Sequence, residues 1–300
     1  MKIAVFGTPQ LAANIFEHLR TCKDIEIVSV VTAPDAPAGR GKKLTPPAVK
    51  TWAETHSIPV FQPNKPDVAT SHKLQEHGAE LFLIISYGFL FSTDFLENSP
   101  PLWNLHFSLL PKFRGASPVQ FAILSGEKES GITVFRITPG LDDGPILGEA
   151  VVYISEKYAN EVFALMEEAG GNLLETLLQH IARGEIISEK IQNHQNASYC
   201  GKIQKNDAEL FPKKETAEEA LQKIRAFSVW PTAWFSLNGK RIKVLRAEHV
   251  PESTPPGTLR GFQDGCLVGF RIGSLNMLQV RPEGKREMTG AEFARGLVSR

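Results

Sequence analysis

The 300-residue chain has few cysteines and no long apolar run, and neither sign of charge is in excess. Its three cysteines, Cys22, Cys200 and Cys266, are far apart and include no CxxC pair, which excludes a disulfide scaffold and indicates a reducing compartment. The longest apolar stretch, residues 81–85, is much shorter than the ~20 residues of a membrane helix. The opening residues MKIAVFGTP lack the apolar core of a secretory signal. We therefore expect a cytoplasmic protein with no membrane partner.

The balance of charge changes along the chain. Lys plus Arg and Asp plus Glu both total 33, but residues 201–300 hold 17 basic and 11 acidic side chains. The carboxyl-terminal third is therefore at +6, and the first 200 residues are at −6. By itself this pattern fits a solvated Lys-rich face as well as a surface for a polyanion.

Short apolar runs alternate with helical patterns through the first half of the chain. The predicted strands cover residues 3–6, 25–31, 59–61, 81–86, 102–106, 132–137 and 146–154, and the predicted helices cover 10–21, 47–56, 68–77, 118–124 and 160–183. Such an alternation predicts an α/β domain, residues 1–191, with a mostly parallel sheet and helices on both faces.

The rest of the chain has a different pattern. Residues 192–214 are polar and read as a linker. Residues 215–300 contain one helical pattern, then short strand-like runs and an Asn238-Gly239 hairpin signal, which predict a small, mostly β domain such as an OB-like barrel.

Ligands of doubly wound sheets bind where the strands end, so the polar residues at those points are the candidates for chemistry. Asn104 and His106 are two residues apart on a predicted strand and share one face. An amide donor beside an imidazole suits the stabilisation of an oxyanion and proton transfer, although a simple hydrogen-bonded His at a strand end fits as well. Asp142 and Asp143 follow another strand, and one of them could orient His106, or both could belong to an ordinary turn. No HxH or HExxH spacing is present, so we expect no metal.

Two further loops are informative. Gly7-Thr8-Pro9 follows the first strand without the GxGxxG spacing, so a dinucleotide is not supported. Residues 34–46 form a long Gly- and Pro-rich connection with Arg40, Lys42 and Lys43, which suit contacts to phosphate if the loop is more than a solvated connection.

Together these segments resemble the folate-dependent formyltransferases, and more narrowly the methionyl-tRNA formyltransferase family. The resemblance rests on FGTPQLAA near the start, SYGFLF at 86–91, NLHFSLLPKFRGASPVQ at 104–120 and GITVFRITPGLDDG at 131–144. PDAPAGRGKKLTPPAVK at 34–50 and RAFSVWPTAWF at 225–235 narrow it to the tRNA-modifying members.

This resemblance implies a Rossmann-like domain joined to an OB-like domain that binds tRNA. It implies an enzyme that transfers the formyl group of 10-formyltetrahydrofolate to the α-amino group of methionyl initiator tRNA. Separately, we expect the enzyme to be a monomer. Asn104 would donate to the formyl oxygen, His106 would stabilise the oxyanion and help proton transfer, and Asp142 would orient His106 and a water.

The resemblance also implies the binding residues. Arg40, Lys42 and Lys43 match the family's tRNA-contacting loop. The folate contacts would come from two segments, Ser86, Tyr87, Gly88, Phe89 and Leu90, and then Ser108, Leu109 and Pro111.

Phe107 and Asp143 depart from the family pattern, in which Gly and Thr are common at these positions. Two alternatives remain, a formyltransferase that acts on glycinamide ribonucleotide or an amino sugar, and a non-catalytic tRNA-binding protein. The glycinamide ribonucleotide enzymes are disfavoured by the absence of a Gly-rich phosphate loop after the first strand. The non-catalytic protein is disfavoured by the presence of all three proposed catalytic residues.

Overall fold

The computed structural model describes residues 1–39 and 41–298. The chain divides into two compact units. Unit 1 comprises Met1–Pro118, Ser130–Tyr153 and Phe163–Gly201, and unit 2 comprises Val119–Glu129, Ile154–Val162 and the residues from Lys202 on. In the described residues, no helix has the length and apolar character needed to cross a membrane.

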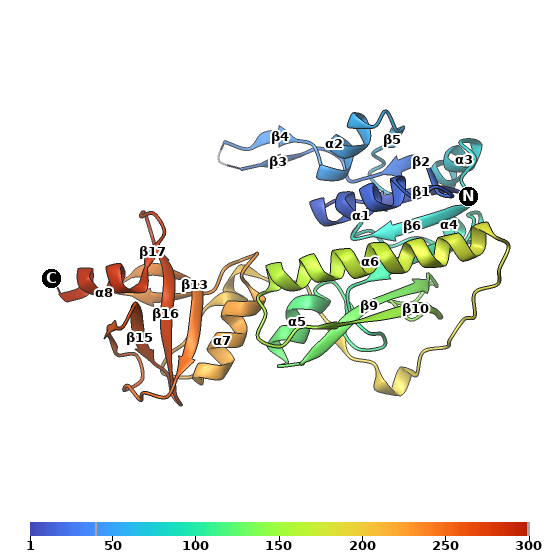
Figure 1. The fold of residues 1–300 in the computed structure, drawn as a ribbon. Coiled ribbons are helices and arrows are strands. Elements are labelled where there is room, and N and C mark those ends of the chain that lie inside the picture. The colour runs from blue at the N-terminus through green and yellow to red at the C-terminus, as the bar shows by residue number, and fades with distance from the viewer. Residues whose placement is uncertain (40, 299–300) are drawn as a thin grey trace. The chain divides into compact units, whose positions relative to one another are not determined.

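Unit 1 is built on a seven-stranded sheet of order β10-β9-β7-β6-β1-β2-β5 (Figure 1). Five of its strands pair in parallel, and these are β1 (Lys2–Gly7), β2 (Glu26–Val31), β5 (Val60–Phe61), β6 (Leu81–Ile85) and β7 (Leu102–His106). Strand β9 (Glu129–Arg136) runs antiparallel to β7, and β10 (Ile146–Tyr153) forms the edge. The sheet confirms the prediction of a mostly parallel α/β domain.

Helices cover both faces of this sheet because alternate strand residues point to opposite sides. One face buries an aromatic core under α3 (Val68–Glu76) and α4 (Thr93–Glu97), with contributions from Phe6, Phe82, Tyr87 and Phe95. The other face lies under α1 (Gln10–Arg20) and α6 (Ala159–Ala182), where the backbone of Gly170 approaches Leu105, Ile15 and Ile132. Helix α2 (Ala48–Thr55) packs beside α1.

Sequence reasoning missed several small elements. Residues 34–46 were expected to form an irregular loop, but β3 (Ala36–Ala38) and β4 (Lys43–Thr45) pair there as an antiparallel hairpin. Helix α4 was not predicted. Strand β8 (Arg114–Gly115) pairs in parallel with β11 (Tyr199–Cys200), which lies in the segment read as a linker. That segment also contains two short 3-10 helices, His194–Asn196 and Lys205–Ala208.

Unit 2 contains a curled antiparallel sheet of order β12-β13-β16-β15-β14, with β17 paired to β16. Its strands are β12 (Trp234–Leu237), β13 (Lys240–Val250), β14 (Leu259–Phe262), β15 (Gly265–Gly269), β16 (Ser274–Pro282) and β17 (Met288–Thr289). The β12–β13 hairpin turns at Asn238 and Gly239, both with positive φ, as the Asn-Gly signal predicted. Helices α7 (Ala217–Ala226) and α8 (Gly290–Val298) close the core, and α5 (Pro118–Leu124) belongs to this unit from Val119 on. The curled sheet agrees with the expected OB-like domain.

Candidate functional site

Asn104 and His106 lie on the last three residues of β7 and share the face of the sheet that carries the aromatic core. Leu102, two residues before Asn104, belongs to that core. Asn104 is half-buried, and among the described residues its side-chain amide has no hydrogen-bond partner. His106 is only 5% exposed, and its ring packs edge-on against Phe135 of β9. The strand therefore presents a free amide next to a buried imidazole.

The hydrogen bonds of His106 define the roles of its two ring nitrogens. Nε2 lies 2.9 Å from the carbonyl oxygen of Phe113 and, as a carbonyl can only accept, must donate to it. In the neutral ring Nδ1 is then the proton acceptor, and it lies 3.7 Å from Oδ2 of Asp142. Burial lowers the pKa of His106, and the Asp142 carboxylate and the Phe113 carbonyl oppose this shift only in part. The imidazole is therefore neutral near pH 7 and can take up a proton at Nδ1.

Asp142 reaches His106 by a route that sequence reasoning did not foresee. The proximity was expected because parallel strands end at one edge of a sheet, but β9 is antiparallel and Arg136 pairs with Trp103, at the start of β7. The loop after β9 returns the carboxylate to the imidazole. Asp142 has a φ of 48°, and its Oδ2 accepts a hydrogen bond of 2.8 Å from the amide of Gly115. Two independent loops thus hold the carboxylate beside Nδ1.

A buried polar group, which the sequence did not reveal, supports this loop. Gln192 donates from Nε2 to the carbonyl oxygens of Asp142 and Gly144, at 2.9 and 2.7 Å. Its Oε1 accepts from the buried guanidinium of Arg114, which also contacts Nδ1 of His194. Gln192 opens the polar segment that was read as a linker, and no local pattern distinguishes it from its neighbours.

The loop that carries Phe113 is closed by the pairing of β8 with β11. The amide of Phe113 donates to Oγ of Ser198, and the amide of Arg114 donates to the Ser198 carbonyl oxygen. Gly115 has a φ of 118°, and a Cβ at this position would lie 2.2 Å from the carbonyl oxygen of Cys200. Only glycine therefore allows this close pairing. The pairing positions both the carbonyl that holds His106 and the amide that holds Asp142.

The first set of predicted folate contacts follows β6, beside Asn104 in the sheet. Ser86 and Gly88 are exposed and have positive φ, and Leu90 is 79% exposed. Tyr87 is buried against Phe6 and Phe89, and burial raises its pKa to about 12. Within the part of the chain that the structure describes, its hydroxyl has no hydrogen-bond partner. The segment offers exposed backbone, an exposed apolar side chain and an unsatisfied hydroxyl.

The second set lies in the loop after His106 and is mostly internal. Ser108 is fully buried and its hydroxyl donates to the carbonyl oxygen of Lys112, so its side chain shapes the loop. Leu109 and Pro111 are half-buried. Of the two departures from the family pattern, Phe107 is buried, and Asp143 accepts a hydrogen bond of 2.5 Å from Thr138. Asp143 therefore has a partner of its own, separate from the pair formed by His106 and Asp142.

The predicted phosphate-binding residues Lys42 and Lys43 lie on the β3–β4 hairpin and are exposed, whereas Arg40 is outside the described residues. The base of the hairpin is fixed. Both oxygens of Asp35 accept from Nζ of Lys50 at 2.9 Å, and Gln62 donates to the same carboxylate. The hydrogen bond from Gln62, which has the largest effect, and then that from Lys50 hold the pKa of Asp35 below its ordinary value. The two lysines are thus presented on an anchored arm of unit 1 (Figure 1).

Unit 2 carries a second group of cations on its sheet. Lys243 of β13 is directly opposite Arg281 of β16, and Arg241, two residues before Lys243, lies on the same face of β13. The guanidinium of Arg241 lies 4.3 Å from the centre of the Trp234 ring. Burial lowers the pKa of Lys243, and the charges of Arg281 and Arg241 lower it further. Like charges placed in opposition across two strands are destabilising unless an anion binds them.

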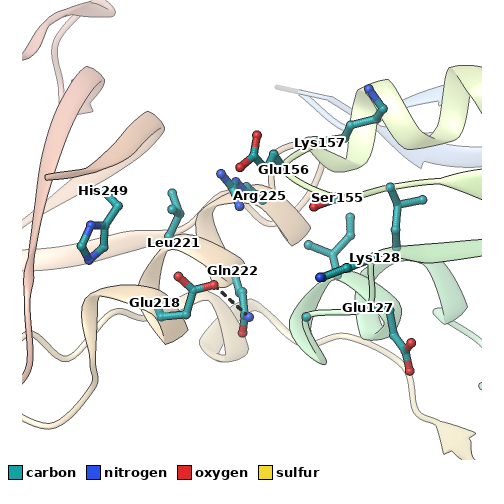
Figure 2. Close-up of a pocket in the computed structure, with 13 residues that line it drawn as sticks. Glu127, Lys128, Ser155, Glu156, Lys157, Glu218, Leu221, Gln222, Arg225 and His249 are labelled. Carbon is teal, nitrogen blue, oxygen red and sulfur yellow. Dashed lines mark hydrogen bonds between the residues drawn. The ribbon is translucent and has the colours of Figure 1, made fainter.

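A cavity of about 310 Å³ in unit 2 contains none of the predicted site residues (Figure 2). Cations and carboxylates line it together, among them Lys128, Arg225, Glu156 and Glu218. This mixture of charges makes it a poor match for either a folate or a phosphate backbone.

Comparisons with known proteins agree with these observations. Residues 1–176 match the family model described as formyl transferase, and residues 202–298 match the formyl transferase carboxyl-terminal domain. A methionyl-tRNA formyltransferase of Thermus thermophilus is 36% identical over 299 residues, which cover 99% of this chain and 96% of the relative.

Two solved structures share the fold. A methionyl-tRNA formyltransferase from Clostridium thermocellum aligns with a TM-score of 0.59 and 17% identity over 83% of this chain and 93% of its own. HypX from Aquifex aeolicus, in complex with tetrahydrofolic acid, aligns with a TM-score of 0.66 and 13% identity. That alignment covers 98% of this chain and only 46% of the longer HypX chain.

Proposed function

The chain belongs to the methionyl-tRNA formyltransferase family, and we propose that Asn104, His106 and Asp142 carry out its reaction. It transfers a formyl group from a folate donor to the amino group of methionyl initiator tRNA, and the proposed donor is 10-formyltetrahydrofolate. The observation that carries the catalytic assignment is the buried imidazole between the Phe113 carbonyl and the Asp142 carboxylate.

The reaction needs one oxyanion to be stabilised and one proton to be moved. The amine attacks the formyl carbon, a C–N bond forms, and the carbonyl oxygen becomes an alkoxide. The free amide of Asn104 donates to this oxygen, an interaction that can contribute roughly 3–4 kcal/mol in the transition state. As the tetrahedral species collapses, the bond to the folate nitrogen breaks and that nitrogen takes up a proton.

His106 and Asp142 handle this proton. The neutral ring accepts the amine proton at Nδ1, directly or through one water, and becomes a cation. The carboxylate of Asp142 then faces a charged N–H donor, which it stabilises, and the ring can next donate to the oxyanion or the leaving nitrogen. The Phe113 carbonyl keeps Nε2 protonated throughout, so it fixes which nitrogen acts.

The proposed folate site extends from Ser86 to Leu90 and along Ser108, Leu109 and Pro111. The unsatisfied hydroxyl of Tyr87 supports a ligand with a polar edge, because a buried hydroxyl without a partner is costly. The exposed side chain of Leu90 supports an apolar or aromatic portion of that ligand. These features fit a folate, which has a polar pterin edge and aromatic rings.

We assign tRNA binding to Arg40, Lys42 and Lys43 and to the domain of residues 215–300, joined to the catalytic domain of residues 1–191 by the segment 192–214. The anchored hairpin and the opposed Lys243 and Arg281 support this assignment. All three proposed catalytic residues lie in one unit, which supports a monomeric enzyme. Three buried free thiols support action in the reducing cytoplasm.

The test is a formylation assay with 10-formyltetrahydrofolate and charged initiator tRNA, with elongator tRNA and an amino-sugar nucleotide as alternative acceptors. Asn104→Ala should lower kcat at least about 10²-fold because one oxyanion donor is removed. Asp142→Asn should have a similar effect, while the matched control Asp143→Asn, which keeps an acceptor for Thr138, should retain most activity. Filter retention should show unchanged tRNA binding in all three variants. Normal turnover of Asn104→Ala or Asp142→Asn would refute the assigned mechanism, and preference for the sugar nucleotide would refute the substrate.

A further inference from the structure

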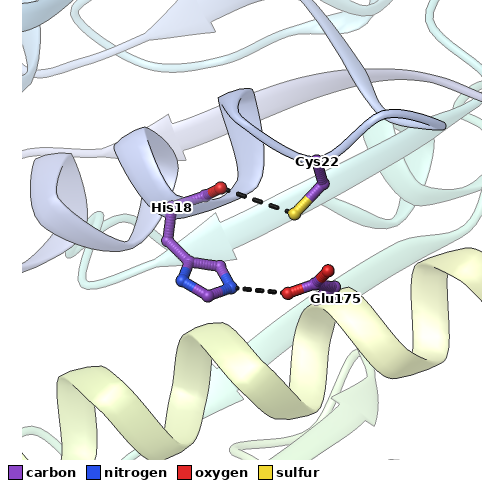
Figure 3. A group of neighbouring side chains, drawn as sticks. All are labelled: His18, Cys22 and Glu175. Carbon is purple, nitrogen blue, oxygen red and sulfur yellow. Dashed lines mark hydrogen bonds and ion pairs between the residues drawn. The ribbon is translucent and has the colours of Figure 1, made fainter.

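Three side chains with different metal-binding atoms converge where α1 ends. His18 lies in the last turn of α1, Cys22 follows the helix by two residues, and Glu175 projects from α6 (Figure 3). Nε2 of His18 is 2.8 Å from Oε2 of Glu175. The imidazole nitrogen, the thiol sulfur and the carboxylate oxygen all lie within 4.8 Å of one another.

The local backbone explains this convergence. His18 and Cys22 are four residues apart, and the amide of Cys22 still bonds to the carbonyl oxygen of Leu19, so both side chains leave the same face of the helical turn. Gly171 lies one turn before Glu175 on α6. A Cβ there would be 3.0 Å from Cγ of His18, so the absence of a side chain lets the imidazole lie directly against α6.

We propose that His18, Cys22 and Glu175 bind a zinc ion, with a water molecule as the fourth ligand. Nitrogen, sulfur and oxygen donors in one small group suit Zn²⁺, which accepts all three in tetrahedral geometry. With bonds of about 2.0–2.3 Å, the ligand atoms of such a site lie roughly 3.5 Å apart. The contact between His18 and Glu175 has to widen slightly, and the three atoms otherwise already lie within reach of one ion.

The Glu175 carboxylate beside His18 favours a cation, whereas the thiol has to lose its proton before it can bind one. Burial, and then the neighbouring Glu175 carboxylate, raise the pKa of the Cys22 thiol to about 11. Without a metal the thiol therefore stays protonated, and it points to the carbonyl oxygen of His18 at 3.4 Å. A bound Zn²⁺ displaces the thiol proton to solvent and neutralises both the thiolate and the carboxylate.

A hydrogen bond from Gln179 already holds the Glu175 carboxylate in position. Nε2 of Gln179 donates to Oε1 of Glu175 at 3.0 Å, which leaves Oε2 directed toward His18. The side chains of His18 and Glu175 are 36% and 34% exposed, so an ion and its water can enter from solvent. Cys22, in contrast, is buried. The site is shielded on one side and open on the other.

This zinc ion is structural and has no part in formyl transfer. Helix α1 begins just after the end of β1 at Gly7 and runs back along the sheet, so its last turn lies away from the strand ends that carry the proposed chemistry. The metal would clamp α1 to α6. The expected effects are therefore on stability, and turnover should be the same with and without zinc.

The experiment uses the full-length, untagged chain, stripped with a chelator and titrated with Co²⁺ as a spectroscopic probe for Zn²⁺. We expect one equivalent to bind, with a near-ultraviolet thiolate-to-cobalt band and visible bands of tetrahedral intensity. Zn²⁺ should displace the Co²⁺ with a Kd below about 1 µM, and it should raise Tm.

The variants Cys22→Ser, His18→Gln and Glu175→Gln each remove one ligand with little change in size. Cys22→Ser should abolish the thiolate band, and the other two should weaken Zn²⁺ binding at least about tenfold. The matched controls are Cys266→Ala, His180→Gln and Glu168→Gln, which alter a buried thiol of unit 2 and two side chains on α6. Circular dichroism before titration verifies that each variant is folded, and Glu175→Gln provides the test if Cys22→Ser is not.

A plain hydrogen-bonded triad is the competing description. It predicts no thiolate band and no increase in Tm with Zn²⁺, and either result with the folded wild-type chain overturns the proposal. A thiolate band that survives in folded Cys22→Ser overturns it as well. Since formylation is measured separately, failure of the zinc site leaves the proposed function intact.

Discussion

A single carbonyl group decides the behaviour of the proposed general base. The Phe113 carbonyl accepts from Nε2 of His106, so the ring can change its protonation state only at Nδ1, which faces Asp142. The geometry therefore pairs the site of proton uptake with the group that stabilises the resulting charge. Cys200 also directs its Sγ to this carbonyl, at 3.3 Å, and burial raises the pKa of that thiol, so it remains neutral.

At this scale we predict a pH dependence of stability. Burial lowers the pKa of His106 from its ordinary value of 6.5. Between the lower folded value and 6.5 the unfolded chain binds more protons, so this residue makes the protein less stable as the pH falls below 6.5. Urea unfolding of wild type and His106→Gln at pH 7.5 and 5 should show a larger drop in stability for wild type. Equal drops would indicate that His106 is not buried as a neutral group.

The pH dependence of formylation should also reflect the protonation of His106. The proposed mechanism needs neutral His106 and an unprotonated acceptor amine, whose ordinary pKa is about 8. The amine causes one decline of kcat/KM as the pH falls, and His106 should add a second decline only below pH 6.5, as the pH approaches its lowered pKa. A second decline centred at or above 6.5 would contradict the burial of the ring.

Two neighbouring strands of unit 2 carry an arrangement that is unfavourable for the free protein. Lys243 and Arg281 are directly opposed on β13 and β16, and Arg241 adds a third cation to the same face. The sheet keeps Ile242 and Val244 in the core on its other face, so these cations cannot turn inward. Such a cluster of like charges is expected where an anionic partner binds and neutralises it.

We therefore predict that Arg281→Gln makes the protein more stable while it weakens the binding of tRNA. Removing one of two opposed charges should raise the free energy of unfolding by roughly 0.2–1 kcal/mol and weaken tRNA binding. Urea unfolding and filter retention measure the two effects, and Arg260→Gln on β14 is the control that should change neither. A variant that is less stable and binds tRNA normally would show that the cluster does not touch tRNA.

At the scale of the whole molecule, the proposed tRNA contacts come from cations of both units. Lys42 and Lys43 belong to unit 1, and the cluster around Lys243 belongs to unit 2. The net charge of zero therefore conceals two surfaces that would each contact phosphates, and association should weaken steeply as salt rises.

The double variant Lys42→Ala/Lys43→Ala should raise the KM for tRNA several-fold and leave the KM for the folate unchanged. The slope of log affinity against log salt should become less steep by about one for each phosphate that the variant no longer neutralises. The control Lys65→Ala/Lys73→Ala removes two exposed lysines elsewhere in unit 1 and should behave as wild type. Equal rises in both KM values would show that the hairpin does not bind tRNA.

Much of the fold follows from periodicity, because the strands of the parallel sheet are continuous apolar runs. The strand at Leu102–His106, for example, was predicted at its observed bounds. The β3–β4 hairpin was missed because each of its strands is only three residues long and β3 consists of Ala and Pro. Its signal was the Gly39 and Gly41 pair, whose positive φ values the turn requires.

The candidate site was only partly visible in the sequence. Asn104 and His106 could be paired from their spacing, but the meeting of Asp142 with His106 depends on an antiparallel strand and a returning loop. Gln192 could not be found at all, since its partners are backbone carbonyls 48 and 50 residues away and a buried arginine. Interactions of this kind arise only when distant segments have folded together.

The pairing of β8 with β11 has a consequence for the order in which the protein is made. A ribosome releases the amino-terminal end first, so Asn104, His106 and Asp142 all emerge before Ser198 and Cys200. Until those later residues arrive, the Phe113 amide cannot bond to Ser198 and Gly115 cannot pair with β11. A nascent chain that stops at residue 190 therefore has every proposed catalytic side chain but lacks the residues that hold them in place. The proposed catalytic site can be completed only late in synthesis.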